Sequence, residues 1–119
     1  MKKTLVIGAS LNPVRYSNMA INRLVSYGHL VVAIGLREGN VAGIDITKEK
    51  EEFKEVDTIT LYLNPRRQID YYKYIISLHP KRVIFNPGTE NPELYKILKE
   101  NAIEFEIACT LVLLSTNQY

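Results

Sequence analysis

The chain has 119 residues, of which 46% are hydrophobic and 24% charged, with one cysteine and a formal net charge of +2. A chain of this length fits a single domain, residues 1–119, and so small an excess of positive charge excludes a typical nucleic-acid-binding protein. No internal disulfide can form, and no apolar stretch approaches the roughly 20 residues that cross a bilayer, so we expect a cytoplasmic protein without a membrane partner.

An opening strand and a helix are predicted within the first 28 residues. The sequence M-K-K-T-L-V-I-G contains only a short apolar run that ends at Gly8, which indicates a strand rather than a signal peptide. The run at residues 5–7 is typical of a parallel strand covered on both faces. Ser17 is suited to cap the helix that follows, and Gly28 to end it. The apolar stripe of this helix is formed by Ala20, Ile21, Leu24 and Val25.

The middle of the chain alternates between strand and helix signals. Residues 30–34 are rich in β-branched side chains and predict a second strand. Residues 37–47 contain two glycines and favour a loop with a minor edge strand. The charge-dense residues 48–55 favour a short surface helix, and residues 58–63 predict a third strand.

Two Asn-Pro pairs mark the starts of the next helices. Asn64 and Asn91 each precede a proline, and asparagine as the cap with proline as the first helical residue is a frequent helix start. Between these helices, residues 82–85 predict a fourth strand, and residues 104–108 predict a fifth. The stripe of the first of these helices is predicted at Ile69, Tyr72 and Ile76.

Five strands joined by helices predict an α/β fold. We expect a three-layer architecture in which an open parallel sheet of five strands has helices on both faces. Two strand orders are common in such sheets, and we expect the order 3-2-1-4-5. This order opens a crevice between the first and fourth strands, where ligands bind at the carboxyl ends of the strands.

Arginines gather in the loops that leave the predicted strands at this edge. Four of the six arginines and none of the nine lysines lie there. Guanidinium groups match phosphate oxygens in two-pronged fashion, so this segregation favours a bound polyanion over simple solvation of the arginines. Positive side chains near helix amino termini also oppose the helix dipole, so they gain nothing structurally. The four are Arg15, Arg37, Arg66 and Arg67.

The same edge is poor in groups for acid-base chemistry. His29 and His79 precede strands and therefore belong to the opposite edge of the sheet. Glu38 and Glu90 are the carboxylates that remain near the predicted ligand. The sequence contains no P-loop lysine motif, no nucleophile elbow and no metal-ligand spacing. These features favour binding over catalysis.

The loop after the first strand carries a longer signature. Residues 8–17, G-A-S-L-N-P-V-R-Y-S, resemble the standalone CoA-binding domain family, whose fold is related to the CoA-binding domain of the succinyl-CoA synthetase α-subunit. The segment F-N-P-G at 85–88 and the late cysteine also fit that pattern. The resemblance implies a Rossmann-like fold with CoA or an acyl-CoA lying across the carboxyl ends of the strands.

The resemblance also implies roles for the matching positions. Backbone amides of the glycine-containing turn would approach the diphosphate, and side chains at the helix start would contact phosphate oxygens. Residues after the fourth strand would border the crevice. The implied set is Gly8, Ala9, Ser10, Arg15, Ser17, Asn86 and Gly88. Asn12 and Asn64 join the candidate set because they lie in the loops that leave the first and third strands at the same edge.

Arg37 supports a separate argument about the cofactor. An acidic residue near the end of the second strand holds a ribose hydroxyl in NAD sites, whereas an arginine accommodates a ribose phosphate. CoA carries such a phosphate, so Arg37 favours CoA. Glu38 is the next residue, and NAD therefore stays open as a competitor.

Three functions remain open at this point. The favoured one is a non-catalytic CoA-binding module that acts as sensor, carrier or regulatory domain. The others are an enzyme dependent on acyl-CoA or NAD(P), and a protein-interaction domain that has lost its ligand. Cys109 is interpreted as a small buried hydrophobe, or alternatively as a thiol that forms a mixed disulfide with CoA. The apolar residues 110–119 favour packing on the sheet or a homodimer.

Overall fold

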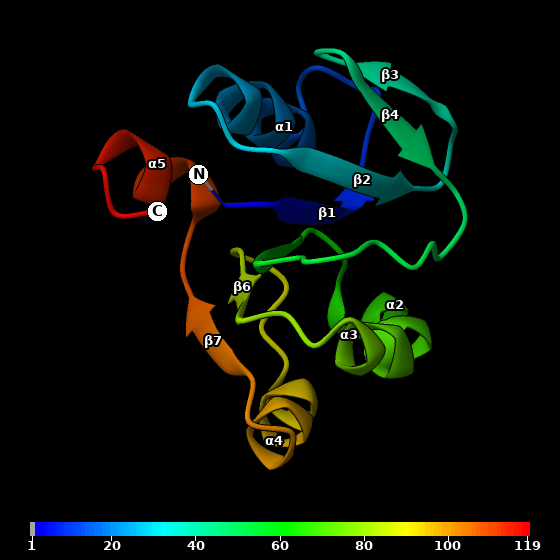
Figure 1. Ribbon diagram of the computed structural model, residues 1–119, viewed down its shortest axis with the longest axis vertical. Coiled ribbons are helices and arrows are strands. Elements are labelled where there is room, and N and C mark those ends of the chain that lie inside the picture. Colours follow the sequence, from blue (N-terminus) through cyan, green and yellow to red (C-terminus); the bar gives the residue numbers. More distant parts are fainter. Residues whose placement is uncertain (1) are drawn as a thin grey trace.

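The computed structural model describes residues 2–119. These residues form a seven-stranded sheet in the order β3-β4-β2-β1-β5-β6-β7, with helices on both faces (Figure 1). The predicted α/β class, a mostly parallel Rossmann-like sheet between two helical layers, is confirmed. The elements are β1 (Thr4–Ala9), α1 (Tyr16–Ser26), β2 (Val31–Gly35), β3 (Gly39–Val41), β4 (Ile44–Thr47), β5 (Thr58–Leu61), α2 (Pro65–Gln68), the 3₁₀ turn η1 (Ile69–Tyr71), α3 (Tyr72–Leu78), β6 (Arg82–Phe85), α4 (Pro92–Glu100), β7 (Glu104–Ile107) and α5 (Thr110–Ser115).

The strand number and order differ from the predicted five strands in the order 3-2-1-4-5. The five predicted strands correspond to β1, β2, β5, β6 and β7, and they lie in the order 2-1-3-4-5 because β5 pairs with β1. The place beyond β2 is taken by β4, which pairs in parallel with β2 and forms a hairpin with β3. The hairpin turn has positive φ at Ala42 and Gly43, as tight hairpin turns require. The crevice therefore opens between β1 and β5.

The helix predicted at residues 48–55 is absent, because the chain there has too far to travel. Residues 48–57 join the carboxyl end of β4 to the amino end of β5, three strand positions away. That is about 14 Å sideways, and the length of a strand comes on top of it. Ten helical residues rise only about 15 Å, so an extended connection is needed. Phe53 anchors this connection on the core, and the Tyr74 hydroxyl donates to the carbonyl of Glu51.

Two hydrophobic clusters hold the helices on the sheet. On one face, α1 and α5 bury Ile21, Leu24 and Leu114 over β1, β2 and β4. On the other face, α3 and α4 cover β1, β5 and β6. Each fully buried Leu or Ile contributes roughly 1.5–3 kcal/mol to stability. Packing of the segment after β7 on the sheet is thus confirmed, while the homodimer stays a prediction.

The stripe predicted for the helix after β5 is confirmed at Tyr72 and Ile76, which pack half-buried against the core. It is wrong at Ile69, which is 55% exposed, and the buried positions of this segment are Gln68, Tyr74 and Ile75. The 3₁₀ turn between α2 and α3 has three residues per turn and shifts the face that meets the core. One consequence is that a glutamine side chain, and not an isoleucine, points inward at the end of α2.

Helix starts depend on the local polar groups. Asn64 and Asn91 cap α2 and α4 as predicted, since their side chains accept backbone N–H groups at 3.0 and 3.3 Å. Ser17 is not the cap of α1, because the helix begins one residue earlier with Arg15 at the cap position. A turn centred on Asn12 leads directly into the helix: its side chain accepts a backbone N–H at 3.1 Å and its carbonyl accepts another at 3.0 Å. Helix α1 therefore starts without a side-chain cap.

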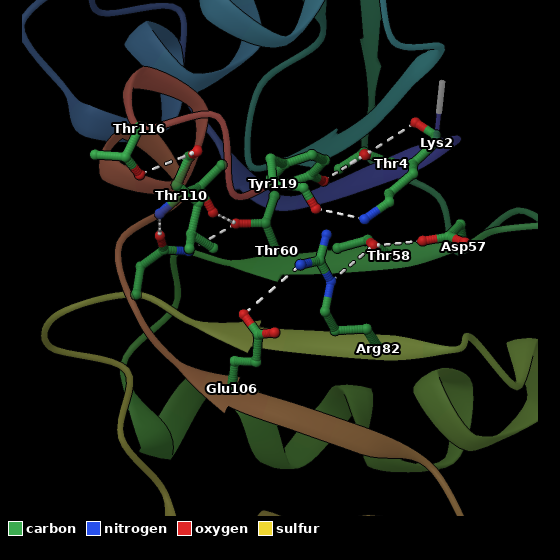
Figure 2. Close-up of polar contacts among 12 residues, drawn as sticks. Lys2, Thr4, Asp57, Thr58, Thr60, Arg82, Glu106, Thr110, Thr116 and Tyr119 are labelled. Carbon is green, nitrogen blue, oxygen red and sulfur yellow. Dashed lines mark hydrogen bonds and ion pairs between the residues drawn. The ribbon is translucent and has the colours of Figure 1, made fainter.

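A polar network covers the amino ends of the central strands on the α5 side (Figure 2). The Tyr119 hydroxyl lies 2.6 Å from Thr4 Oγ1, and its ring lies 4.6 Å from the Arg82 guanidinium carbon. Arg82 Nε donates to Thr58 Oγ1 at 3.1 Å, and its Nη1 lies 3.6 Å from a carboxylate oxygen of Glu106. This network lies at the edge of the sheet opposite the crevice, so we assign it to stability.

His29 gives this network a pH dependence. Its Nδ1 accepts the backbone N–H of Lys2 at 2.9 Å, which requires an unprotonated nitrogen. Burial, with the positive charges of Lys2 and Arg82, lowers the pKa of His29 below its ordinary value of 6.5. The unfolded chain then takes up a proton more readily than the folded one, so the stability from neutral His29 is complete above about pH 6.5 and is lost as the pH falls through the folded pKa.

We expect the Tm of the wild-type chain to fall between about pH 7 and pH 5, and His29→Gln to lose this component of the decrease. Scanning calorimetry over that range measures it. His79→Asn is the control, because His79 is exposed and its φ of 46° suits asparagine. Superimposable pH profiles for the wild type and His29→Gln would refute the role of His29.

Candidate functional site

A cavity of about 450 Å³ lies at the carboxyl ends of β1, β2, β5 and β6. Small-molecule sites typically enclose roughly 300–1,000 Å³. The cavity lies where the chain reverses its direction across the sheet, between β1 and β5, which is the expected place for a ligand in an open α/β sheet. Its lining residues are 8–11, 15–17, 35–37, 62–64, Arg67, Tyr71 and 87–89.

The start of this cavity is shaped by close backbone contacts. Gly8 has a φ of +94°, and a Cβ there would lie 2.9 Å from the backbone carbonyl of Tyr62. A Cβ at Gly35 would lie 2.3 Å from the carbonyl oxygen of Ala9. Only glycine fits such close approaches. The three strand ends therefore converge at the base of the loop that follows β1.

The loop after β1 and the first turn of α1 present free backbone donors to the cavity. The absence of a side-chain cap leaves the first helical N–H groups open, at the positive end of the helix dipole. An anion is the natural partner of such groups. Within this loop and first helical turn, four cavity-lining residues have backbone N–H groups without an acceptor among residues 2–119: Ser10, Leu11, Tyr16 and Ser17.

Three arginines line the same cavity: Arg15, Arg37 and Arg67. Within residues 2–119 the single salt bridge joins Arg82 to Glu106, so no carboxylate lies within 4 Å of the three guanidinium groups. They follow β1, β2 and β5, which are adjacent in the sheet, and so form a row in the order 37, 15, 67. Unpaired guanidinium groups beside free amides make this cavity strongly attractive to phosphate.

Eight of the ten predicted site residues lie together around the cavity. They are Gly8, Ala9, Ser10, Arg15, Ser17, Arg37, Asn64 and Gly88.

Asn12 and Asn86 do not line the cavity. Asn12 is exposed and shapes the loop after β1 through its own turn. Asn86 is 1% exposed: its Nδ2 donates to Thr60 Oγ1 at 2.7 Å and to a carbonyl of β5, and its Oδ1 accepts the backbone N–H of Thr110 at 2.9 Å. The hydroxyls of Thr60 and Thr110 lie 2.8 Å apart beside it (Figure 2). Asn86 thus fixes the start of the loop after β6.

Three tyrosines of the cavity lining were not predicted: Tyr16, Tyr62 and Tyr71. Tyr62 falls inside the predicted third strand, but β5 ends one residue before it. Its hydroxyl lies beside Thr60 and Thr110 without a hydrogen-bond partner among residues 2–119, and burial raises its pKa. Burial also raises the pKa of Tyr71, although nearby Arg67 opposes the shift. Both phenols stay protonated at neutral pH and cannot act as proton acceptors there.

The remaining chemistry of the described residues is limited. No Asp, Glu, His, Lys or Cys lines the cavity described above. Cys109 is a free, half-buried thiol at the cap position of α5, outside the cavity lining. Within residues 2–119, no three metal-ligating side chains gather, and no helix has the length and apolarity to span a membrane.

These features define a class: a Rossmann-like α/β protein with an anion-binding cavity at its first strand-helix turn. Residues 2–115 match the family model described as "CoA binding domain", and the chain belongs to this family. The family prediction is thereby confirmed. None of the curated proteins matches the chain.

Solved structures share the fold over nearly the whole chain. A crystal structure of an uncharacterized protein is 52% identical, with a TM-score of 0.97 and coverage of 100% of this chain and 98% of that chain. The protein cell-free ID.343 from Thermus thermophilus is 22% identical, with a TM-score of 0.86 and coverage of 99% and 90%. A dinucleotide-forming acetyl-coenzyme A synthetase from Ca. Korarchaeum cryptofilum is 16% identical, with a TM-score of 0.73 and coverage of 90% and 25%. The last two show the fold alone.

We expect Gly8→Ala to lower the free energy of unfolding by more than about 2 kcal/mol, because the new methyl group meets the Tyr62 carbonyl at an unfavourable φ. Gly88→Ala is the matched variant: its φ of +93° is the same, but no atom lies within 4 Å of its Cβ position. We expect only about 1–2 kcal/mol there. Urea denaturation measures both, and equal losses would contradict the close approach at Gly8.

Proposed function

We propose that this chain is a non-catalytic CoA-binding module that holds CoA or an acyl-CoA in the cavity and serves as a sensor, carrier or regulatory domain. Membership of the CoA binding domain family supports the choice of ligand. The observation that carries the proposal is the row of three unpaired arginines beside the free amides of the loop after β1.

The charge of CoA suits this row. CoA has a diphosphate and a ribose phosphate, three phosphoryl groups in all, and the cavity offers three guanidinium groups. In the proposed mode the ribose phosphate meets Arg37 beside β2. The diphosphate lies over the start of α1 between Arg15 and Arg67. Its remaining partners are the free backbone amide of Ser10, which follows the turn at Gly8 and Ala9, and the hydroxyl of Ser17.

The neutral pantetheine arm then extends toward β6. Asn64 and Gly88 border its path, since they lie in the loops after β5 and β6 and line the cavity. Asn12 and Asn86 do not touch the ligand in this proposal. They hold the loops that do, through the hydrogen bonds described above.

The non-catalytic part of the proposal is supported by the composition of the cavity lining. Acid-base catalysis needs a titratable group near the reacting atoms, and within residues 2–119 the cavity lining offers tyrosines and arginines only. As part of the same proposal, residues 1–119 act as one domain in the cytoplasm, with homodimer formation as an additional prediction. Turnover of an acyl-CoA, or of an NAD(P)-linked substrate, would instead favour an enzyme.

We expect Arg67→Gln to weaken CoA binding about tenfold or more, because it removes a charged donor to phosphate. Arg66→Gln is the matched control: it is the neighbouring residue of α2, carries the same charge and does not line the cavity. Isothermal titration calorimetry of both variants and the wild type tests the difference. Equal affinities of the two variants, or a wild type that binds neither CoA nor NAD nor NADP, would remove the proposal.

We expect Arg37→Gln to weaken CoA binding about tenfold and to leave the affinity for 3′-dephospho-CoA roughly unchanged. Only CoA carries the phosphate that Arg37 is proposed to bind. Competition calorimetry with the two ligands separates the effects. A wild-type preference for NAD over CoA, reduced by Glu38→Gln, would support the NAD alternative instead.

A further inference from the structure

Gln68, the last residue of α2, has an amide group with no exposure to solvent. Its Nε2 donates to the carbonyl oxygens of Leu63 and Thr89, both at 2.8 Å. Its Oε1 accepts a hydrogen bond from Asn91 Nδ2 at 2.9 Å. Both donors and the oxygen of this amide are therefore used inside the protein.

The two carbonyl groups belong to two neighbouring loops that both line the cavity. Leu63 lies in the loop after β5, which leads to Arg67, and Thr89 lies in the loop after β6, next to Gly88. The backbone ladder between β5 and β6 ends at the pair Leu61–Phe85. Beyond that pair, the spacing of the loops depends on side chains such as Gln68.

Burial of an amide needs a reason, because an apolar side chain of the same size avoids its desolvation cost. Gln68 meets that cost with three hydrogen bonds, and two of them join cavity-lining residues. The Thr89 hydroxyl in turn donates to the Asn86 carbonyl at 2.7 Å, which holds the second loop to the end of β6. The result is a buried bridge that ties together the two loops lining one side of the cavity.

We propose that Gln68 is a positioning residue that fixes the loops after β5 and β6 relative to one another, where they line the path of the pantetheine arm of CoA. This inference rests on the proposed function. Gln68 makes no hydrogen bond to the loops after β1 and β2, where Arg15 and Arg37 lie. A ligand confined to that side of the cavity should therefore not depend on Gln68.

The test compares CoA with adenosine 3′,5′-bisphosphate, which keeps the ribose phosphate and the 5′-phosphate but lacks the arm. We expect Gln68→Met to weaken CoA binding about tenfold, because the unbridged loops must be ordered by the ligand. The affinity for the bisphosphate should stay unchanged. Calorimetry with both ligands on the wild type and the variant gives the two ratios.

Tyr72→Phe is the matched control. The Tyr72 hydroxyl accepts from Asn91 Nδ2 at 2.8 Å at the outer end of the same network and makes no hydrogen bond to a cavity-lining residue. Both affinities should stay unchanged in this variant. Gln68→Glu replaces Gln68→Met if that variant does not fold. A protonated glutamic acid side chain at position 68 can donate one hydrogen bond to the loops, whereas the carboxylate can donate none. The affinity of Gln68→Glu for CoA should therefore rise as the pH is lowered, while its affinity for the bisphosphate should not.

Each contrary result has its own meaning. If Gln68→Met lowers the affinities for CoA and for the bisphosphate by the same factor, Gln68 supports the fold in general and the positioning role is refuted. Unchanged CoA binding in this variant refutes it as well, and in either case the proposed function stands. If the wild type binds the bisphosphate but not CoA, or binds neither, the proposed function is removed and this inference with it.

Discussion

The backbone contact between Gly8 and Tyr62 is the constraint on which the site depends. A Cβ at Gly8 would lie 2.9 Å from that carbonyl, and a φ of +94° turns the chain away from the line of β1. Because of this turn, the following loop leaves the sheet between β1 and β5 and leads to an uncapped helix start. The free amides and the cavity are therefore consequences of one close approach between two parallel strands.

Polar groups around the cavity divide into two sets with different hydrogen bonding. The side-chain amides of Asn86, Gln68 and Asn91 are buried, and hydrogen bonds within the protein satisfy them. The guanidinium groups of Arg15 and Arg37 have no such partners among residues 2–119. Buried polar groups need hydrogen-bond partners within the folded protein. Exposed polar groups can instead form hydrogen bonds with water until a ligand displaces that water. Folding thus fixes the walls of the cavity, and the unpaired cations are left for recognition.

The sequence predicted what local chemistry decides and missed what distant chain segments decide. The helix starts at Asn64 and Asn91 follow from side-chain capping within three residues, and the arginine-rich edge follows from strand direction alone. Strand order depends instead on where the short β3–β4 hairpin pairs, which no pattern within 37–47 reveals. The predicted cap at Ser17 failed because the upstream turn starts the helix earlier. No sequence pattern predicted the burial of Gln68, since a glutamine in a helix is ordinarily exposed and the 3₁₀ turn that follows α2 changes which face meets the core.

The row of arginines has an energetic consequence for the free protein. Like charges that line one cavity repel one another, and within residues 2–119 no carboxylate forms an ion pair with Arg15, Arg37 or Arg67. Such repulsion is tolerated because these side chains reach solvent at the mouth of the cavity, where water and salt screen them. A ligand with several phosphate groups removes the repulsion and gains attraction at the same time, whereas a ligand with a single charge gains only part of both. The three cations that line the cavity therefore favour a multiply phosphorylated ligand over one with a single charge.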